Sequence, residues 1–407
     1  MKACVFTLGC KMNEVESASL MRGLEERGWE VTDELGYADL YLLNTCAVTA
    51  EAEKKSRQAV ARMRKYNGNA PVVVFGCASE RDGKVFAEKE GVTLVTGAQN
   101  KKKVLEALEE KGIFREAETA FCELPPPKRT KTRAYLRIQD GCNRFCSYCV
   151  IPYLRGRTRS RSAESILEEA ETCAAKEIVL TGIDVSSYWD GETDLGALLE
   201  KLSKIPARFR LGSLEAGVVT EEFLQKMKNA GNVAEHFHLS LQSGSSAVLR
   251  AMNRHYTREE DLECCRKIYE YFPNAAVTTD IIVGYPTETE EDFEKSLSII
   301  EEAGFARVHC FPFSSRPGTA AAKLRDLSSA VKKERMSRIT AAAKEAEKRY
   351  IKKFFGKELV VLFEDDGGYA ENYIRVYAEG AREGELCRVR LTGYKKDGAS
   401  AEILEVL

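Results

Sequence analysis

The sequence predicts an α/β protein with three parts: an open parallel sheet, an incomplete parallel (β/α) barrel and a small antiparallel β-barrel. Apolar segments typical of strands alternate with amphipathic helical segments in residues 1–118, and the same alternation recurs through residues 134–313. From residue 354 the pattern changes to short strands between glycine-rich turns, which predicts the small barrel.

The 407-residue chain is 44% hydrophobic and 30% charged, which is typical of a soluble globular protein with two or three domains. No apolar run reaches the ~18 residues of a membrane span, and the N-terminus lacks the features of a signal peptide. We therefore expect a cytoplasmic protein without a membrane partner. Thirteen cysteines in a reducing compartment favour metal or cluster ligation over disulfides. With a net charge of −2, affinity for nucleic acid must come from local basic patches.

The first part is expected to contain four strands and an amphipathic helix over Asn13–Arg27. The strands are expected at Lys2–Leu8, Leu40–Asn44, Pro71–Gly76 and Thr93–Val95. Strands that alternate with helices in this way form parallel sheets.

One cysteine follows each of the first three strands, namely Cys10, Cys46 and Cys77. In an open parallel sheet such residues gather beyond the carboxyl ends of the strands, where these folds bind ligands. Glycines directly before Cys10 and Cys77 allow the backbone to approach a ligand closely. We interpret the three cysteines as ligands of one cluster. The competing interpretation is that they are small buried side chains, as we expect for Cys4 inside a strand.

Residues 119–133 are expected to form a linker, because three consecutive prolines at 125–127 favour an extended, semi-rigid backbone. The barrel strands are expected at Ala134–Gln139, Ile178–Ile183, Phe209–Leu214, Phe237–Gln242, Ala276–Val283 and Arg307–Pro312. Active sites of parallel barrels lie at the C-terminal ends of the strands. The segment after the first barrel strand is therefore expected on the active face.

That segment carries three cysteines spaced C-x3-C-x2-C, at Cys142, Cys146 and Cys149. A structural zinc site needs four ligands, and no fourth cysteine or histidine lies nearby. Three thiolates suit an iron–sulfur cluster with one open iron. The competing interpretation, three free cysteines grouped by packing alone, fits such close spacing of a scarce residue poorly.

Basic residues are concentrated around this segment. Residues 125–161 contain ten Lys or Arg and one Asp, and arginines alternate at Arg155, Arg157, Arg159 and Arg161. Arginines neutralise RNA phosphates and stack on unpaired bases, so these four are candidate RNA contacts. Some of them are alternatively expected to bind a cofactor carboxylate or to hold the loop in place. A further basic helical stretch at 323–353 is interpreted as a solvated helix face.

The last part is expected to contain three strands separated by turns such as the one at Gly367-Gly368. The strands are expected at Leu359–Glu364, Tyr373–Ala378 and Leu386–Leu391. Small barrels of this type often bind nucleic acid, although a fold alone is weak evidence for a function.

Six motifs together resemble the radical S-adenosylmethionine (SAM) methylthiotransferases over essentially the whole chain. They are Thr7 to Asn13 (TLGCKMN), Asn44-Thr45-Cys46, Gly76-Cys77, Asp140 to Arg161, His238 to Gly244 (HLSLQSG) and Phe313 to Thr319 (FSSRPGT). The resemblance implies an N-terminal methylthiotransferase cluster domain at 1–118, a linker at 119–133, a radical SAM barrel at 134–345 and a TRAM-like RNA-binding β-barrel at 346–407.

Three branches of this family act on an isopentenylated tRNA adenosine, a ribosomal-protein aspartate or a threonylcarbamoylated tRNA adenosine. Leu8 to Lys11 (LGCK) and Ile138 to Asn143 (IQDGCN) resemble the third branch. The resemblance therefore implies insertion of a methylthio group at C2 of N6-threonylcarbamoyladenosine at tRNA position 37, next to the anticodon. The other two substrates are the alternatives.

The resemblance implies two 4Fe–4S clusters, with SAM serving both as radical source and as methyl donor. Radical chemistry is the task of the cofactors, because C2 of adenine is neither acidic nor electrophilic enough for acid–base chemistry. The implied catalytic and iron-binding residues are the six cysteines already described. Candidate SAM contacts, each with a structural hydrogen bond as the alternative, are Tyr148, Thr181, Gly182, Glu215, Ser240, Gln242, Asp280 and Gly284.

The implied partners are SAM, the anticodon stem-loop of tRNA, an electron donor and a sulfur source, and we expect a monomer. The sequence identifies neither the donor nor the sulfur source. It departs from the family pattern at Ala216, where proline is frequent, and at Thr287, where glycine is usual. Both departures lie in loops near the candidate SAM contacts, and neither affects a cysteine.

Overall fold

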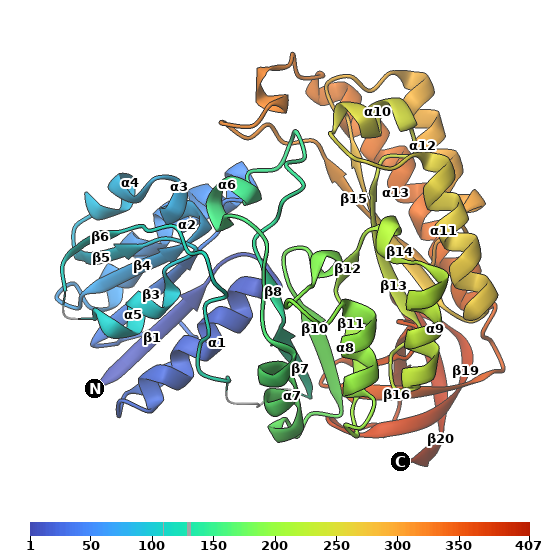
Figure 1. The fold of residues 1–407 in the computed structure, drawn as a ribbon, viewed down its shortest axis with the longest axis horizontal. Coiled ribbons are helices and arrows are strands. Elements are labelled where there is room, and N and C mark those ends of the chain that lie inside the picture. Colours follow the sequence, from blue (N-terminus) through green and yellow to red (C-terminus); the bar gives the residue numbers. More distant parts are fainter. Residues whose placement is uncertain (109, 128–131) are drawn as a thin grey trace.

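The computed structural model describes residues 1–108, 110–127 and 132–407 (Figure 1). An N-terminal α/β lobe (blue) lies against a central open barrel (green to orange), and a small C-terminal barrel (red) lies beneath the central one (Figure 1). The α/β architecture with a terminal β-barrel is as predicted.

The N-terminal lobe contains a six-stranded, wholly parallel sheet in the order β2-β1-β3-β4-β5-β6. Its strands are β1 (Lys2–Thr7), β2 (Glu30–Thr32), β3 (Leu40–Thr45), β4 (Val72–Gly76), β5 (Val92–Thr96) and β6 (Gly112–Phe114). Its helices are α1 (Lys11–Glu25), α2 (Ala50–Tyr66), α3 (Cys77–Arg81), α4 (Gly83–Ala87) and α5 (Lys101–Glu106). The four predicted strands are present. Sequence analysis missed β2 and β6 because three-residue strands carry little periodicity.

The inner strands of this sheet are buried on both faces, as expected when helices cover a parallel sheet. Every residue of β3 and β4 is buried. Helix α2 begins where the Thr49 side chain accepts a hydrogen bond from the Ala52 amide, a typical N-cap, and its buried stripe includes Ala59, Val60 and Met63.

The central barrel consists of two parallel sheets, β11-β10-β7 and β12-β13-β14-β15. Its strands are β7 (Arg133–Arg137), β10 (Glu177–Thr181), β11 (Arg208–Leu211), β12 (Ser213–Leu214), β13 (His236–Gln242), β14 (Ala276–Val283) and β15 (Arg307–Pro312). The predicted third strand is divided into β11 and β12 at Gly212, so the six predicted strands appear as seven.

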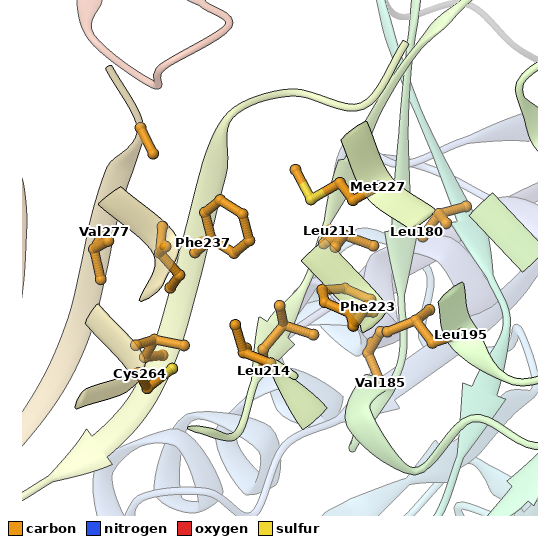
Figure 2. Close-up of a cluster of buried hydrophobic side chains, with 14 of the residues drawn as sticks. Leu180, Val185, Leu195, Leu211, Leu214, Phe223, Met227, Phe237, Cys264 and Val277 are labelled. Atoms are coloured by element: carbon orange, nitrogen blue, oxygen red, sulfur yellow. The ribbon is translucent and has the colours of Figure 1, made fainter. Parts of the chain in front are cut away.

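Helices cover the outside of this barrel, in the order α7 (Ala163–Thr172), α8 (Leu195–Leu202), α9 (Glu221–Ala230), α10 (Ser246–Ala251), α11 (Arg258–Tyr271) and α12 (Glu290–Glu302). Figure 2 shows the apolar core between strands and helices, where Leu180, Leu211 and Phe237 lie near Phe223 and Met227 of α9. This core therefore holds the strands against the covering helices.

The first barrel strand is shorter than predicted. It ends at Arg137, and β8 (Gln139–Asp140) instead pairs antiparallel with β9 (Arg159–Ser160). The hairpin between β8 and β9 contains the cysteine loop, defined here as residues 140–149, and the short helix α6 (Ile151–Arg155). Helix α6 lies between the N-terminal lobe and the central barrel (Figure 1).

The C-terminal barrel is closed, in the order β16-β17-β18-β20-β19. Its strands are β16 (Glu358–Glu364), β17 (Gly367–Ala370), β18 (Arg375–Ala378), β19 (Leu386–Lys395) and β20 (Gly398–Val406). The prediction of an antiparallel barrel needs one correction, because β18 and β20 pair in parallel. Closure of five strands, an odd number, requires one such parallel contact. Helix α13 (Ser329–Lys352) precedes this barrel and accounts for most of the basic stretch.

The C-terminal barrel closes the amino end of the central barrel. Arg208 and Arg210 of β11 pair with Glu177 of β10 and donate to backbone carbonyls of β16 and β17. The Tyr373 ring stacks on His236 at a centroid distance of 4.0 Å. The opposite, carboxyl end of the central barrel therefore remains for a ligand. No described helix is long and apolar enough to cross a membrane.

Candidate active site

Three cysteines of the N-terminal lobe lie at the carboxyl ends of three neighbouring strands. Cys10 caps α1 after β1, Cys46 directly follows β3, and Cys77 directly follows β4. Strand β3 pairs with both β1 and β4. The three cysteines are therefore brought to neighbouring strand ends, although tens of residues separate them in the chain. We call Cys10, Cys46 and Cys77 the N-terminal trio. Cys10 is exposed, whereas Cys46 and Cys77 are buried.

Two glycines allow the backbone of this trio to pack closely. Gly9 has φ +121°, and a Cβ atom there would lie 3.1 Å from the Cys46 Sγ. Gly76 has φ +104°, and a Cβ atom would lie 2.5 Å from the Asn44 side-chain oxygen. Both backbone conformations disfavour residues with side chains. The close contacts at these two glycines are with other parts of the protein, and the predicted close approach to a ligand stays a prediction.

The second set, Cys142, Cys146 and Cys149, lies in the cysteine loop and is called the loop trio. Each of its sulfur atoms accepts an N–H group. The Arg144 amide lies 3.4 Å from the Cys142 Sγ, and the Ile151 amide lies 3.4 Å from the Cys149 Sγ. The Arg254 guanidinium lies 3.2 Å from the Cys146 Sγ. Donors directed at all three sulfurs are typical of thiolates that hold an iron–sulfur cluster.

The donor sets of both trios fit iron–sulfur clusters, because each trio offers three free cysteine thiols. Burial raises the pKa of Cys77 and of Cys142 to about 11 and that of Cys149 to about 12, so ligation must release protons from these thiols.

A buried polar chain connects the two trios. The Cys10 thiol lies 3.8 Å from the Asn13 side-chain oxygen, which accepts a hydrogen bond of 2.9 Å from Arg155. Arg155 also donates at 3.0 Å to Asp140, the first residue of the cysteine loop, and Asp140 accepts the Gly141 amide at 2.8 Å. Arg155 thus bridges the start of α1 and the start of the cysteine loop.

The two carboxylates in this chain have cationic partners. Glu16 of α1 pairs with Arg155 at 2.8 Å and with Lys101 at 3.0 Å, and none of the three side chains is exposed. Burial alone would raise the pKa of Glu16, but the charges of Arg155 and Lys101 outweigh burial and lower that pKa. The same two cations hold the pKa of Asp140 far below its usual value despite burial. Glu16 and Asp140 are therefore ionised at neutral pH.

The prediction that four alternating arginines contact RNA needs correction for three of them. Arg155, Arg159 and Arg161 are buried. Arg159 donates to the Arg155 carbonyl at 2.8 Å, and Arg161 pairs with Glu123 and Glu169. Only Arg157 is exposed. The alternation that suggested a basic surface instead reflects β9 and its flanks, which direct arginines into the interface between the lobe and the barrel.

Most candidate SAM contacts lie at or near the carboxyl edge of the central barrel. Thr181 ends β10 and Gly182 follows it, where a Cβ atom would lie 2.9 Å from the Gln139 side chain. Gln242 ends β13 with φ +74°, a strained conformation that is typical of functional sites. The Ser240 carbonyl accepts a 2.8 Å hydrogen bond from Arg254. Tyr148 packs with Val248, Met252, Tyr285 and Phe313 beside the cysteine loop.

Other candidates have structural partners in this arrangement. Glu215 pairs with Arg144 at 2.9 Å and with Arg254 at 2.8 Å, which joins β12 to the cysteine loop. Asp280 lies inside β14 and pairs with His238 at 3.3 Å. The Gly284 amide donates to Glu288 at 2.7 Å, and the side chain of Lys332 occupies the space beside Gly284. These contacts position the loops around the site.

Sequence reasoning missed several residues that hold the trios in place. Asn13 and Glu16 lie on α1 and Lys101 lies on α5, and no sequence spacing links these residues to Arg155. Gln139 is expected in the first barrel strand and in the branch motif at Ile138 to Asn143, with no role of its own. Its side chain donates to the Gly141 carbonyl at 2.7 Å and accepts the Asp184 amide at 2.8 Å, which anchors the cysteine loop to the end of β10. The one sequence feature that points to this role of Gln139 is its polar side chain directly before the cysteine loop.

A cavity of about 520 Å³ lies between α1 and β7. It is lined near the N-terminal trio by Thr7, Lys11, Glu14 and Tyr135. The Lys11 ammonium lies 3.1 Å from the Glu14 carboxylate and 5.1 Å from the centre of the Tyr135 ring. Lys11 directly follows Cys10 in the chain and contributes an ammonium group to the lining of this cavity.

Family models match both catalytic parts of the chain. The Radical SAM superfamily matches residues 136–300, and the Uncharacterized protein family UPF0004 matches residues 2–97. The solved structure of the radical SAM methyltransferase TsrM from Kitasatospora setae, with cobalamin and a [4Fe-4S] cluster bound, is similar in fold. Its TM-score is 0.61 at 15% identity, over 79% of this chain and 76% of that one.

Curated relatives extend over nearly the whole chain. The threonylcarbamoyladenosine tRNA methylthiotransferase MtaB of Aquifex aeolicus is 37% identical over 96% of this chain and 100% of its own length. The Bacillus subtilis protein of the same name is 34% identical over 98% of this chain and 96% of its own length. The tRNA-2-methylthio-N(6)-dimethylallyladenosine synthase of Staphylococcus haemolyticus is 35% identical over 96% of this chain and 82% of its own length. The chain therefore belongs to the radical SAM tRNA methylthiotransferase family and is a tRNA-modifying enzyme.

Proposed function

We propose that this enzyme inserts a methylthio group at C2 of N6-threonylcarbamoyladenosine at tRNA position 37. The observation that carries the proposal is the pair of cysteine trios, which are joined through Asn13, Arg155 and Asp140. One trio lies at the carboxyl edge of the N-terminal sheet and the other follows β7 of the barrel. Two thiol sites so close together suit a reaction that requires both an activated substrate carbon and a sulfur source.

Each trio would hold one 4Fe–4S cluster and leave one iron open. The open iron at the loop trio would bind SAM, and the open iron at the N-terminal trio would hold the sulfur that is transferred. When bound, these cofactors supply the radical and sulfur chemistry that an unreactive aromatic C–H bond requires. The protein supplies binding, orientation and exclusion of side reactions.

In this proposal, some residues around the loop trio hold the cysteine loop in position and others contact SAM. Glu215 holds Arg144 and Arg254, and Arg254 in turn donates to the Cys146 sulfur. Thr181, Gly182, Ser240, Gln242 and Tyr148 are the proposed SAM contacts, because they surround the carboxyl edge where parallel barrels bind substrates. Asp280 and Gly284 are proposed to shape that pocket through their hydrogen-bonded partners.

The choice of a threonylcarbamoylated base has support in the cavity beside the N-terminal trio. A threonylcarbamoyl group carries a carboxylate, whereas an isopentenyl group is apolar. The Lys11 ammonium lines the cavity close to Cys10 and would pair with that carboxylate. Several relatives at 34–37% identity carry the threonylcarbamoyladenosine name. The isopentenylated adenosine and the ribosomal-protein aspartate are the alternatives.

We further propose that RNA is bound across residues 134–345, a radical SAM domain, and residues 346–407, a TRAM-like barrel. Residues 1–118 would be the cluster domain and residues 119–133 the linker, part of which lies outside the described residues. Of the four arginines considered for RNA, Arg157 remains the proposed contact.

Mass spectrometry of tRNA hydrolysates tests the substrate. We expect 2-methylthio-N6-threonylcarbamoyladenosine to disappear from cells that lack the gene and to return on complementation. Persistence of that nucleoside together with loss of the methylthio-isopentenyl nucleoside would support the first alternative. Unchanged tRNA together with loss of a modified ribosomal-protein aspartate would support the second.

A Lys11→Gln variant tests the carboxylate contact. With reconstituted enzyme, we expect KM for threonylcarbamoylated stem-loop RNA to rise about tenfold, because one charge-assisted hydrogen bond is lost. Arg22→Ala, which removes another charge from the lining of the same cavity, is the control. An unchanged KM would contradict the role of Lys11 without affecting the methylthiotransferase assignment.

A further inference from the structure

Three side chains in and beside the cysteine loop form an aromatic and cationic group, in which Tyr153 and Arg157 are exposed and Phe145 is half-buried. The rings of Phe145 and Tyr153 meet edge to face, with a centroid distance of 5.4 Å and an interplanar angle of 79°. The guanidinium carbon of Arg157 lies 4.6 Å from the centre of the Phe145 ring. We call Phe145, Tyr153 and Arg157 the stacking platform.

The backbone holds this platform rigidly. Phe145 has φ +48°, a conformation that a bulky residue keeps only where its surroundings enforce it. The Asn253 side chain donates to the Phe145 carbonyl at 3.0 Å and to the Arg144 carbonyl at 3.2 Å. On the Arg157 side, the Cys142 amide donates to the Gly156 carbonyl at 3.1 Å. The platform is thus ordered before any partner arrives.

The fold does not use the exposed groups of the platform. Tyr153 is 60% exposed. Among the described residues, the Arg157 guanidinium forms no ion pair, whereas Arg155, Arg159 and Arg161 are buried and paired. A solvent-exposed tyrosine and an unpaired guanidinium on an aromatic ring add little to stability. Their arrangement is better explained by a ligand with a flat face.

The substrate chemistry identifies that ligand, if the proposed tRNA substrate is correct. An adenine that reacts at C2 must leave the base stack of its loop to enter the site. Its neighbouring bases then lose a stacking partner. Aromatic rings and arginine guanidinium planes stack on such unpaired bases in single-stranded RNA. We propose that the stacking platform binds a nucleotide adjacent to the modified adenosine, with that base on Tyr153 or on the outer face of Arg157.

A fluorescent base analogue tests this contact. The probe is an anticodon stem-loop RNA with 2-aminopurine on either side of the target adenosine, and it is titrated with reconstituted full-length enzyme. We expect binding to quench the fluorescence at one of the two positions. Tyr153→Ala and Arg157→Ala should each raise Kd roughly 5- to 100-fold and remove the quenching, as loss of one base-stacking contact predicts.

Matched variants separate stacking from general effects. Tyr153→Phe should retain the quenching, whereas Tyr153→Leu, similar in bulk but not aromatic, should lose it even if the alanine variant folds poorly. Tyr37→Ala removes a tyrosine that is 64% exposed near the amino end of β3, away from the cysteines, and should not change Kd. Arg266→Ala is the corresponding control for an exposed arginine on α11.

The outcomes distinguish the platform from the proposed function. If the wild-type enzyme binds RNA but the Tyr153 and Arg157 variants keep its Kd and quenching, the platform is overturned while the tRNA substrate stands. Slower reduction by a redox-protein donor in these variants, with RNA affinity unchanged, would also overturn it and indicate a protein-docking site. No RNA binding by the wild-type enzyme would overturn the proposed function itself.

Discussion

The Arg155 guanidinium donates to both carboxylate oxygens of Glu16, at 2.8 Å and 3.2 Å, and neither side chain has exposed surface. Glu16 belongs to α1 of the N-terminal lobe, and Arg155 ends α6 after the cysteine loop. The pair therefore joins two parts of the chain that each carry a cysteine trio. Asp140 and Lys101 extend this buried group, which also includes Arg137 at 3.5 Å from Glu16 and Arg159 at 3.7 Å from Asp140.

Arg155→Ala should destabilise the protein by about 3–5 kcal/mol, because the buried carboxylates of Glu16 and Asp140 lose a cation that they share, at 2.8 Å and 3.0 Å. Replacing both residues, as Arg155→Met with Glu16→Met, should recover part of this loss, because the Glu16 carboxylate is then no longer buried without this cation. Denaturant titration of each variant gives the coupling energy.

The surface pair of Arg22 and Glu26 is the control, with an N–O distance of 3.0 Å and both side chains more than 40% exposed. Arg22→Ala should cost less than about 1 kcal/mol. Equal effects of Arg22→Ala and Arg155→Ala would contradict a special role for the buried pair.

Removal of a cysteine from one trio or the other should show that the two sites have different roles in the reaction. Cys142→Ala should abolish SAM cleavage, measured as methionine and 5′-deoxyadenosine. Cys10→Ala should leave part of that cleavage but stop methylthiolation. Iron content should fall from about eight to about four atoms per chain in both variants. Cys173→Ala, at a half-buried cysteine outside both trios, is the control. Equal loss of cleavage in the two trio variants would contradict the division of roles.

Gly76→Ala should damage the N-terminal trio without removing a thiol. With φ +104°, a Cβ atom there would lie 2.5 Å from the Asn44 side-chain oxygen and 2.6 Å from the Thr45 carbonyl. We expect more than about 2 kcal/mol of destabilisation and loss of roughly half the iron.

The comparison for Gly76 is Gly28→Ala, at φ +81° with no atom within 4 Å of the added Cβ. That variant should show only the backbone strain of about 1 kcal/mol and full iron content. Full iron content in Gly76→Ala would show that the close approach there is not required.

Asp261 should make stability depend on pH. Burial, with the nearby charges of Glu215 and Glu260, raises its pKa to about 8 against the opposing effect of Arg254. In the unfolded chain the carboxyl has its ordinary pKa of about 4. Between these two values the native state binds the extra proton, so its stability is full below about pH 4 and falls as pH rises toward 8.

Asp261→Asn removes that titration. The variant should exceed wild type in unfolding free energy by on the order of 3 kcal/mol at pH 9, with little difference at pH 4. Glu263→Gln, on the exposed face of the same helix, should show no such trend. A constant difference between Asp261→Asn and wild type from pH 4 to pH 9 would contradict a raised pKa.

Local patterns predicted most of the fold. Alternation of apolar strands and helices located ten parallel strands, because inner strands such as β3 and β4 are apolar on both faces. The short strands β2, β6, β9 and β17 and the half-exposed last strand, β20, are absent from the prediction, because brief or exposed strands carry little apolar periodicity. The parallel contact of β18 with β20 depends on barrel closure, which strand periodicity does not encode.

The sequence by itself determined the chemistry: the spacing of Cys142, Cys146 and Cys149 is local, and parallel strands bring Cys10, Cys46 and Cys77 to one edge by a general rule of sheets. Only the tertiary structure decided which arginines are exposed. Arg155, Arg157, Arg159 and Arg161 have the same spacing, yet three are buried and one is exposed. Their burial depends on carboxylates such as Glu16, Glu123 and Asp140 from other elements, because a buried charge is tolerated only where the fold supplies its partner.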